Sequence, residues 1–588
     1  MEMQFGSLTE NILLDKMFQN RGYTGEFLDA LDRTVDGVLP LNTDAMCGKL
    51  KELHDSGAEI GFIPDFDMDG IMSGVIGFAG LAELGFNVHL YMPNVLMGYG
   101  FGAHDIDRLL EQHENVSAIL TADVGVSCYE GVERAKARGL TVLITDHHLP
   151  DAGRVGADII VDPMQPDDAY YNPKICGAHV IYQVLARYAE LYCIKPVQAQ
   201  IRRLRVFAAI GTISDSMPVY YNNRSLIRDG ISIAKLVYSN GNRFIVDAIQ
   251  GHPVYRRAFY GLFAVIQAHA DAGKLQSADA IDEDFFGYYL APMFNSVKRM
   301  EEDIQLAFGV FFGRHPEDDI DTLMALNNER KQQVTRWMDE IIQQDNPYAP
   351  YLYVTDASPG LRGLLATKLM QPAAGPCLVV ARQDDGSFIG SGRSPFWFNF
   401  LMESADYRAR GFGQDIDAAV RLSGPDGFFA AGHEQAFGTR FETEQDLEAA
   451  ARWIQSMAEH KLAGMDKRVL ENKPDFIIAQ DGSGDIDLDI MAFAEFLDAL
   501  QDYRPFGVGF AEPNILLTFR MGDAEWSCMG KEKQHLRIKL ALGFEVLCWN
   551  QAFRLDEFKA DDVIHVWGHL NRNQYRDIQT IQFIGSLE

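Results

Sequence analysis

The sequence predicts a multidomain α/β protein that ends in a small β-barrel domain. Between residues 60 and 162, short apolar runs alternate with segments of helical spacing. Residues 320–341 repeat apolar side chains on one helical face, which is typical of a long helix. After about residue 470 the chain changes to short strands and turns. With 588 residues, of which 47% are hydrophobic, the chain is large enough for several such domains.

The first domain is predicted from five strand-like runs that alternate with helical segments. These runs are GFIP, VHLYMP, AILTAD, TVLITD and ADIIVD. Such alternation favours a mainly parallel sheet with helices on both faces. Ligands of these sheets gather at the carboxyl ends of the strands. The residues that end the runs are mostly acidic, so this edge is the first place to look for a functional site.

The rest of the chain is predicted to contain a helical region, a long helix, a second α/β domain and a barrel. Five or six strand-like runs after residue 470 indicate a small antiparallel barrel of the OB-fold type. The expected parts are an N-terminal helical segment at 1–50, the first α/β domain at 51–312, a connecting helix at 313–346, a second α/β domain at 347–468 and the OB-fold at 469–588.

Charge and cysteine content narrow the class of protein. The chain has 52 Lys and Arg against 83 Asp and Glu, a net charge of −31. This argues against a protein that coats DNA through net positive charge, so a nucleic acid would need a local basic groove or a metal. The seven cysteines are well separated and form no C-x-x-C pair, which indicates reduced thiols. Since the sequence also shows no signal peptide and no membrane-spanning run, we expect a cytoplasmic protein.

The first strand is followed by three carboxylates at alternate positions. Asp65, Asp67 and Asp69 precede Gly70, and their like charges repel one another when they are held together. A divalent cation would relieve this repulsion, although a solvated acidic turn would also explain the pattern. An EF-hand is disfavoured because its twelfth position, Ile76, is not the required glutamate.

Two further strand ends and one helical segment add acidic and imidazole side chains. The third run ends at Asp123, and the fourth ends in Asp146, His147 and His148; Asp215 follows in ISDSMP. Carboxylate oxygens with imidazole are typical ligands of Mn²⁺ or Mg²⁺ rather than of structural zinc. Three acidic strand ends on one edge of a sheet therefore predict a metal site more strongly than any one of them alone.

Several motifs in colinear order resemble those of the DHH phosphoesterase superfamily, and within it most closely the RecJ family of single-strand-specific 5′→3′ exonucleases. The motifs that carry the resemblance are DFDMDG, TADVGVSCYEGVERAKARGLTVLITDHHLP, GTISDSMPVYYNNR, LAPMFNSVKRM, GSGRS, AAGHEQAFG and RPFGVGFAEP. The resemblance therefore covers most of the chain from about residue 55 to its end. The order of the motifs makes coincidence an unsatisfactory explanation.

The resemblance implies a site with two Mn²⁺ or Mg²⁺ ions and a separate pocket for the end of the strand. Metal ligands by this resemblance are Asp65, Asp67, Asp69, Asp123, His147 and Asp215, with Asp123 between the ions. Residues that would contact the scissile phosphate are His148, Asn295 and Arg299. Ser391 and Arg393 would anchor the 5′-phosphate, and Gly432 and His433 would form a loop that the strand approaches closely.

The activity implied by the resemblance is hydrolysis of single-stranded DNA from its 5′ end to 5′-mononucleotides, in DNA repair and recombination. Single-stranded DNA-binding protein and a RecQ-type helicase would be partners of a monomer that does not bind membranes. The chain departs from the family pattern at Val95, Met293, Lys298 and Ser358. Lys298 could compensate electrostatically for arginines missing elsewhere, which is a hypothesis.

Two other functions remain as alternatives. A phosphodiesterase of short oligonucleotides or cyclic dinucleotides would share the site, but such relatives are shorter and lack the C-terminal barrel. A DNA-binding scaffold without metal is disfavoured, because clustered carboxylates that serve no purpose would destabilise the fold.

Two sets of side chains could hold an unpaired strand. The densest basic strip comprises Lys531, Lys533, His535, Arg537 and Lys539, and it would follow a strand across an OB-fold. Aromatic residues at 396–400 could stack on bases, although burial is the better expectation for at least two of them. A solvated barrel face is the alternative explanation for the basic strip.

Overall fold

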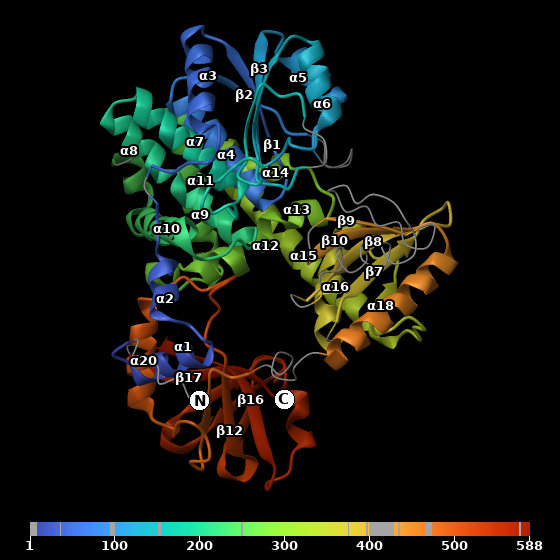
Figure 1. The fold of residues 1–588 in the computed structure, drawn as a ribbon. Helices are drawn as coiled ribbons and strands as arrows, with labels where there is room; N and C mark the ends of the chain where they lie inside the picture. The colour runs from blue at the N-terminus through green and yellow to red at the C-terminus, as the bar shows by residue number, and fades with distance from the viewer. Residues whose placement is uncertain are drawn as a thin grey trace. The chain divides into compact units, whose positions relative to one another are not determined.

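Figure 1 shows the computed structural model of the chain, which divides into two compact units. The larger unit comprises Val35–Met217 and Ser225–Gly464; the smaller comprises Met1–Thr34, Pro218–Arg224 and Met465–Glu588. The structure describes residues 9–35, 37–93, 100–150, 155–247, 251–373, 375–395, 398, 428–432, 435–464, 473–575 and 578–587. The five domains expected from the sequence are not tested by this division into two units and stay a prediction.

The larger unit begins with the predicted parallel sheet, whose five strands lie in the order β2-β1-β3-β4-β5. All four neighbouring pairs are parallel. The strands are β1 (Glu59–Pro64), β2 (Asn87–Leu90), β3 (Val116–Ala122), β4 (Thr141–Thr145) and β5 (Ile159–Val161). The chain passes from β1 outward to β2 and then returns to β3 on the other side of β1. Such a reversal of strand order is where ligands bind in open α/β sheets.

Helices cover both faces of this sheet, as the pattern predicts (Figure 1). On one face α4 (Met68–Glu83) packs against β1 and α7 (Gly177–Tyr192); on the other lie α5 (Ala103–Gln112) and α6 (Tyr129–Ala137). Side chains of β1 alternate between the faces. Phe62 points to α4, where a Cβ on Gly77 would lie 2.0 Å from its ring, and Ile63 joins the α5 side with Leu109. Helix α3 (Thr43–Asp55) packs on α7.

Helices form the middle of the larger unit, and one of them, α10 (Tyr221–Asp247), begins with residues of the smaller unit. The helices are α8 (Lys195–Arg203), α9 (Arg205–Ser214), α10, α11 (Pro253–Asp271), the π-helix η3 (Phe285–Leu290), α12 (Ala291–Phe294), α13 (Ser296–Arg299) and α14 (Gln305–Phe312). The expected long helix is α15 (Pro316–Gln343). Its buried face carries Ile320, Leu323, Val334 and Ile341, together with two polar residues, Asn327 and Arg330.

A second sheet in the larger unit has five strands in the order β6-β7-β8-β10-β9. They are β6 (Leu352–Val354), β7 (Cys377–Arg382), β8 (Phe388–Arg393), β9 (Phe428–Gly432) and β10 (Ala436–Phe441). Only β6 and β7 pair in parallel. Helix α16 (Pro359–Ala373) packs on one face through Leu361 and Leu365, and α18 (Glu444–Gly464) packs on the other through Ile454. The sequence prediction of a second α/β region is thus confirmed.

The smaller unit carries a seven-stranded sheet in the order β11-β12-β16-β17-β15-β14-β13. Its strands are β11 (Phe476–Ala479), β12 (Ile515–Arg520), β13 (Glu525–Met529), β14 (His535–Lys539), β15 (Glu545–Cys548), β16 (Val563–Tyr575) and β17 (Ile578–Leu587), and α20 (Ile490–Gln501) lies between β11 and β12 in sequence. The sheet differs from the expected small antiparallel barrel in two respects. Among the described residues no pairing closes the sheet, and β11–β12 and β15–β17 pair in parallel. An intervening element separates each of these pairs in sequence, and such a connection allows parallel pairing.

N-terminal residues belong to this smaller unit rather than to the parallel sheet. Helices α1 (Ile12–Asn20) and α2 (Gly25–Leu31) precede the first strand, and α1 contacts α20 and β11. Arg21 forms an ion pair with Asp475 at 2.7 Å. The fully buried Arg224 donates to the carbonyl of Pro505 at 2.9 Å. Three separated segments of the chain thus share one core.

In the described part of the chain, every helix is too short or too polar to cross a lipid bilayer.

Close packing of α4 on β1 makes Gly77 a test of the fold. We expect Gly77→Ala to lower the free energy of unfolding by about 1–3 kcal/mol, because the new methyl group would collide with the buried Phe62 ring. Gly48→Ala is the matched control in α3, where a Cβ meets nothing within 4 Å; it should stabilise the protein by about 0.5–1 kcal/mol. Urea unfolding measures both, and a Gly77→Ala protein as stable as wild type would contradict this packing.

Candidate metal centre

The predicted strand-end side chains meet at the carboxyl edge of the parallel sheet. Asp65 follows β1, Asp123 follows β3 and Asp146 follows β4. Each backbone N–H extends the sheet by one more hydrogen bond, from Asp65 to Ala122 at 3.2 Å and from Asp123 to Thr145 at 3.0 Å. Asp123 then takes the left-handed conformation, with φ of 65°, which turns the chain sharply at this edge.

Two carboxylates of the first motif bind helix N-termini. Asp67 caps α4, and its Oδ1 accepts from the N–H groups of Asp69 and Gly70 at 3.1 and 3.2 Å. Asp69 accepts from the N–H groups of Gly177 and Ala178, at 2.7 and 3.2 Å, at the start of α7. Helix N-termini stabilise negative charge, so these contacts hold both carboxylates in place.

The third carboxylate of the motif has an unsatisfied oxygen. Asp65 is 3% exposed, and its Oδ1 has no hydrogen-bond partner among the described residues. A buried oxygen without a donor is costly. This atom therefore fits a bound cation.

Asp146 orients both histidines of the Asp-His-His turn. Its Oδ1 accepts from the backbone N–H groups of His147 and His148, at 2.8 and 3.2 Å, and lies 2.8 Å from Nδ1 of His148. Its Oδ2 accepts from the N–H of Val126 at 3.0 Å. Sequence reasoning noted Asp146 in the motif but assigned it no role, although its place directly after a buried strand was the available signal.

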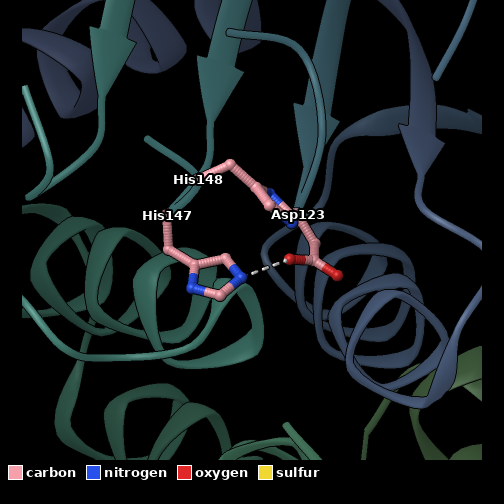
Figure 2. Close-up of side chains that lie close together, drawn as sticks. All are labelled: Asp123, His147 and His148. Atoms are coloured by element: carbon pink, nitrogen blue, oxygen red, sulfur yellow. Dashed lines mark ion pairs between the residues drawn. The ribbon is translucent and has the colours of Figure 1, made fainter. Parts of the chain in front are cut away.

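His147 points into the carboxylate cluster. Its Nε2 lies 3.1 Å from Oδ1 of Asp123 (Figure 2), and 3.8 and 3.7 Å from the carboxylates of Asp69 and Asp215. Asp215 is half-buried at the end of α9. All six side chains expected to bind metal thus come together, from four separate stretches of the chain.

Three sets of ligand atoms lie within 4.8 Å of one another and could each hold a cation. They are Asp123, His147 and His148; Asp69, His147 and Asp215; and Asp65, Asp67 and Asp123. Asp123 and His147 each belong to two of these sets. The oxygen and imidazole donors, with the unsatisfied Asp65 oxygen, fit Mn²⁺ or Mg²⁺.

Crowding of acids shifts their proton affinities in the metal-free site. Burial, with the charge of Asp67, raises the pKa of Asp65 to about 7 and that of Asp69 to about 6. Burial and neighbouring carboxylates likewise raise the pKa values of Asp123 and Asp215. For Asp67, burial acts upward, but the charge of Lys298 and other favourable contacts outweigh it and lower the pKa.

Neighbouring negative charge also affects the pKa of His148, where it stabilises the protonated form. Burial by itself would lower its pKa, but the charge and hydrogen bond of Asp146 outweigh burial and raise it to about 10. The imidazole is therefore protonated at neutral pH in the metal-free protein.

Three guanidinium groups gather where α13, α15 and the second sheet meet. Burial and the nearby charges of Arg330 and Arg393 lower the pKa of Arg299 to about 10. None of the three forms an ion pair with any residue that the structure describes. Arg393 donates to the carbonyl of Gly392 at 2.8 Å, and Arg330 donates to Oδ1 of Asn327. Uncompensated arginines of this kind favour a bound phosphate.

Arg330 is a member of this cluster that sequence reasoning missed. It is 9% exposed and lies on the buried face of α15. The signal was present, because Leu323, Arg330, Val334 and Ile341 follow one another at helical spacing. A charged residue on an apolar stripe requires an explanation, and the pattern alone did not supply one.

The remaining predicted substrate residues are placed only in part. Oδ1 of Asn295 accepts from the N–H of Met68 at 2.9 Å, so this side chain joins α12 and α13 to the start of α4. Ser391 and Arg393 share one face of β8, and Gly432 ends β9. His433 lies outside the described residues.

The aromatic residues at 396–400 and the basic strip at 531–539 are the two sets expected to hold an unpaired strand. Phe398 is fully buried in the second α/β core, while Phe396, Trp397 and Phe400 lie outside the described residues. The basic strip follows β14 and the turn before it. There His535 meets the half-exposed Trp549 edge-on, with ring centroids 4.9 Å apart.

Known families match both units. Residues 59–210 match the N-terminal domain of the DHH family, and residues 485–585 match the RecJ OB domain. The chain is 24% identical to single-stranded-DNA-specific exonuclease RecJ of Haemophilus influenzae, over 91% of this chain and 88% of that protein. It is 26% identical to the Escherichia coli exonuclease of the same name, over 65% of this chain and 66% of that protein.

A solved structure shares the fold over nearly the whole chain. RecJ from Thermus thermophilus in complex with Mn²⁺ covers 98% of this chain and 76% of its own, with a TM-score of 0.67 and 20% sequence identity. The same protein in complex with Mg²⁺ gives a TM-score of 0.63. The predicted resemblance and fold class are confirmed, apart from the open, mixed C-terminal sheet.

Raised carboxyl pKa values predict how the metal-free protein responds to pH. A carboxyl with a higher pKa in the folded state stabilises the fold below its usual value near 4, and this stability is lost as pH rises through the raised value. For Asp65 and Asp69, whose pKa values are about 7 and about 6, this stability is lost as pH rises from about 4 to about 7. His148, whose pKa is also raised, loses its contribution as pH rises above about 6.5 towards 10. All three therefore act in the same direction.

We expect the melting temperature of the chelated protein to fall from about pH 5 to about pH 8, and Mn²⁺ to raise it more at the higher pH. Differential scanning fluorimetry with EDTA or Mn²⁺ measures this. Asp123→Asn removes one of the crowded acids and should reduce the fall. A melting temperature of the chelated protein that rises over this range would contradict the account.

Proposed function

Because residues 59–210 match the DHH family and residues 485–585 match the RecJ OB domain, we propose that this chain is a metal-dependent nuclease that degrades single-stranded DNA from the 5′ end and releases 5′-mononucleotides. The observation that supports this most is the convergence of Asp65, Asp67, Asp69, Asp123, His147 and Asp215 on one buried edge. Relatives of this chain are named single-stranded-DNA-specific exonucleases, and one RecJ has been solved with Mn²⁺ and with Mg²⁺.

We assign two cations to the cluster of Asp65, Asp67, Asp69, Asp123, His147 and Asp215, in which Asp123 would be shared between them. Bound there, divalent cations lower the pKa of water and neutralise charge on a phosphodiester. The chain's own groups do the rest. N–H groups at the starts of α4 and α7 hold Asp67 and Asp69 in fixed positions before any ion binds. A preformed ligand set needs little rearrangement during the reaction.

His148 is proposed to donate a hydrogen bond to a non-bridging oxygen of the scissile phosphate. Asp146 contacts Nδ1 of this ring, so Nε2 is the nitrogen assigned to the substrate. The negative charge of Asp146 also favours the protonated ring. Negative charge that builds up on the phosphate would be stabilised by such a donor.

The arginine cluster is proposed to hold the 5′-terminal phosphate. Arg393 and Arg299 were expected at the strand end and the scissile phosphate respectively, and the structure brings their charges close together. A terminal phosphate carries more negative charge than an internal one, so uncompensated guanidinium groups favour it. Ser391, on the same face of β8, would contribute a hydroxyl.

The smaller unit is proposed to bind the strand beyond the site. Its basic residues along β14 and the half-exposed Trp549 have the chemistry of a single-strand track. The cytoplasmic location, the role in repair and recombination, and partnership with single-stranded DNA-binding protein and a RecQ-type helicase stay predictions from the resemblance.

A phosphodiesterase of cyclic dinucleotides is less well supported, because it gives the RecJ OB domain no purpose. A metal-free scaffold is disfavoured by the complete ligand cluster. Incubation of 5′- and 3′-end-labelled single and double strands with Mn²⁺, Mg²⁺ or EDTA separates these functions. We expect labelled mononucleotide first from the 5′ label, on single strands only and never in EDTA; any other ladder would overturn the proposal.

Asp123→Asn should lower the turnover number on single-stranded DNA by at least about 10³-fold, because the shared ligand loses its charge. The variant should remain folded, with a melting temperature in EDTA no lower than that of wild type. Asp107→Asn is the control, since Asp107 pairs with Arg134 and Arg138 outside the cluster. Turnover near the wild-type value for Asp123→Asn would remove the assignment of this ligand.

Arg393→Ala should raise KM on 5′-phosphorylated strands by about 10- to 100-fold, the value of a lost charge-assisted hydrogen bond. On 5′-hydroxyl strands the effect should be much smaller. Arg440→Ala, in the same sheet and paired with Glu442, is the control and should change neither. Equal effects of Arg393→Ala on the two kinds of end would contradict the terminal-phosphate site.

A further inference from the structure

A lysine ammonium lies beside the metal-ligand cluster. Nζ of Lys298, in α13, is 3.8 Å from Oδ2 of Asp67 and 4.5 Å from the centroid of the Phe66 ring. The ring face attracts the ammonium, and the carboxylate pairs with it. The two contacts hold the positive charge of Lys298 at the edge of the cluster of negatively charged carboxylates.

The backbone fixes this lysine in place from two sides. Asn295, three residues earlier, accepts from the N–H of Met68 at 2.9 Å, which ties this segment to the turn that carries Asp67. On the other side, a Cβ on Gly360 would lie 2.2 Å from the carbonyl oxygen of Arg299. Lys298 therefore projects from a tightly packed segment, in contrast to a lysine on an open surface.

The two oxygens of Asp67 have different partners. Oδ1 caps α4 through two backbone N–H groups, and Oδ2 is the oxygen nearest Lys298. Asp67 also belongs to a ligand set with Asp65 and Asp123. Since Oδ1 is occupied by the cap, Oδ2 is the oxygen that both a cation and the ammonium can use.

A cation at this set would repel the ammonium. The Lys298 side chain is 40% exposed, so it has solvent on one side into which it can move. A phosphate at the metal centre would bring non-bridging oxygens close to the same position. A lysine ammonium is a compact charge on a flexible stem, which suits it to exchange one anionic partner for another.

We propose that Lys298 exchanges partners during the cycle: it pairs with Asp67 before metal binds, and with a non-bridging oxygen of the substrate phosphate afterwards. Only the second half of this inference, the pairing of Lys298 with a substrate phosphate, rests on the proposed function. It makes Lys298 a substrate-binding residue that also opposes metal binding in the absence of DNA. Removal of the Lys298 charge should thus strengthen the affinity for metal and weaken the affinity for the DNA strand.

The first test measures Mn²⁺ affinity by isothermal titration calorimetry without DNA. Lys298→Met should bind Mn²⁺ about 3- to 10-fold more tightly than wild type, because a competing charge has gone. Lys298→Arg keeps the charge and should stay within about twofold of wild type. Lys136→Met is a closely matched control, since Lys136 pairs with Asp158 at similar exposure away from the cluster. Unchanged or weaker Mn²⁺ binding by Lys298→Met would overturn the proposal.

The second test measures binding of a fluorescent single strand in Ca²⁺ at several salt concentrations. Lys298→Met should bind the strand more weakly, and its slope of log affinity against log salt should be shallower by about 0.7, the value of one lost phosphate contact. An unchanged slope would overturn the second half of the proposal. Failure of wild-type protein to degrade end-labelled DNA would instead reject the proposed function, and the Mn²⁺ titration would still decide whether Lys298 competes for Asp67.

Discussion

Repulsion among buried carboxylates is the constraint around which the larger unit is arranged. Asp65, Asp69 and Asp123 are each at most 3% exposed and come together at one sheet edge. Ionised together without a cation they would destabilise the fold, and their raised pKa values express that cost. Positive ends of two helices reduce the repulsion but leave an oxygen of Asp65 without a partner. The site is therefore built to receive positive charge.

The buried arginines form a second cluster, whose excess charge is positive. Arg299, Arg330 and Arg393 are partly or wholly buried close to one another, with no carboxylate paired to them among the described residues. The carboxylate cluster thus carries excess negative charge, and the arginine cluster carries excess positive charge. A DNA strand with its bound cations would satisfy both, since its phosphates are the anions and the metal site takes the ions. Lys298 lies at the edge of the metal cluster and can serve either side of this balance.

Asp146 shows how a residue without direct contact to the proposed substrate can matter. It organises the turn after β4 through three backbone N–H groups and one imidazole. Nε2 of His147 is directed at Asp123 (Figure 2), whereas Nδ1 of His148 lies 2.8 Å from Oδ1 of Asp146. Two adjacent residues of one type acquire different environments in this way, and we assign them different roles.

The sequence by itself determined which strand ends would meet, because parallel strands place their carboxyl ends on one edge; Asp65, Asp123 and the Asp-His-His turn could be grouped on that ground. It also indicated α15 from the helical spacing of its apolar residues. Only the tertiary structure decided that Arg330 joins Arg299 and Arg393, that Lys298 reaches Asp67, and that the last sheet is open and partly parallel. Periodicity reports which face of an element is buried, whereas the partner of that face depends on packing between segments far apart in the chain.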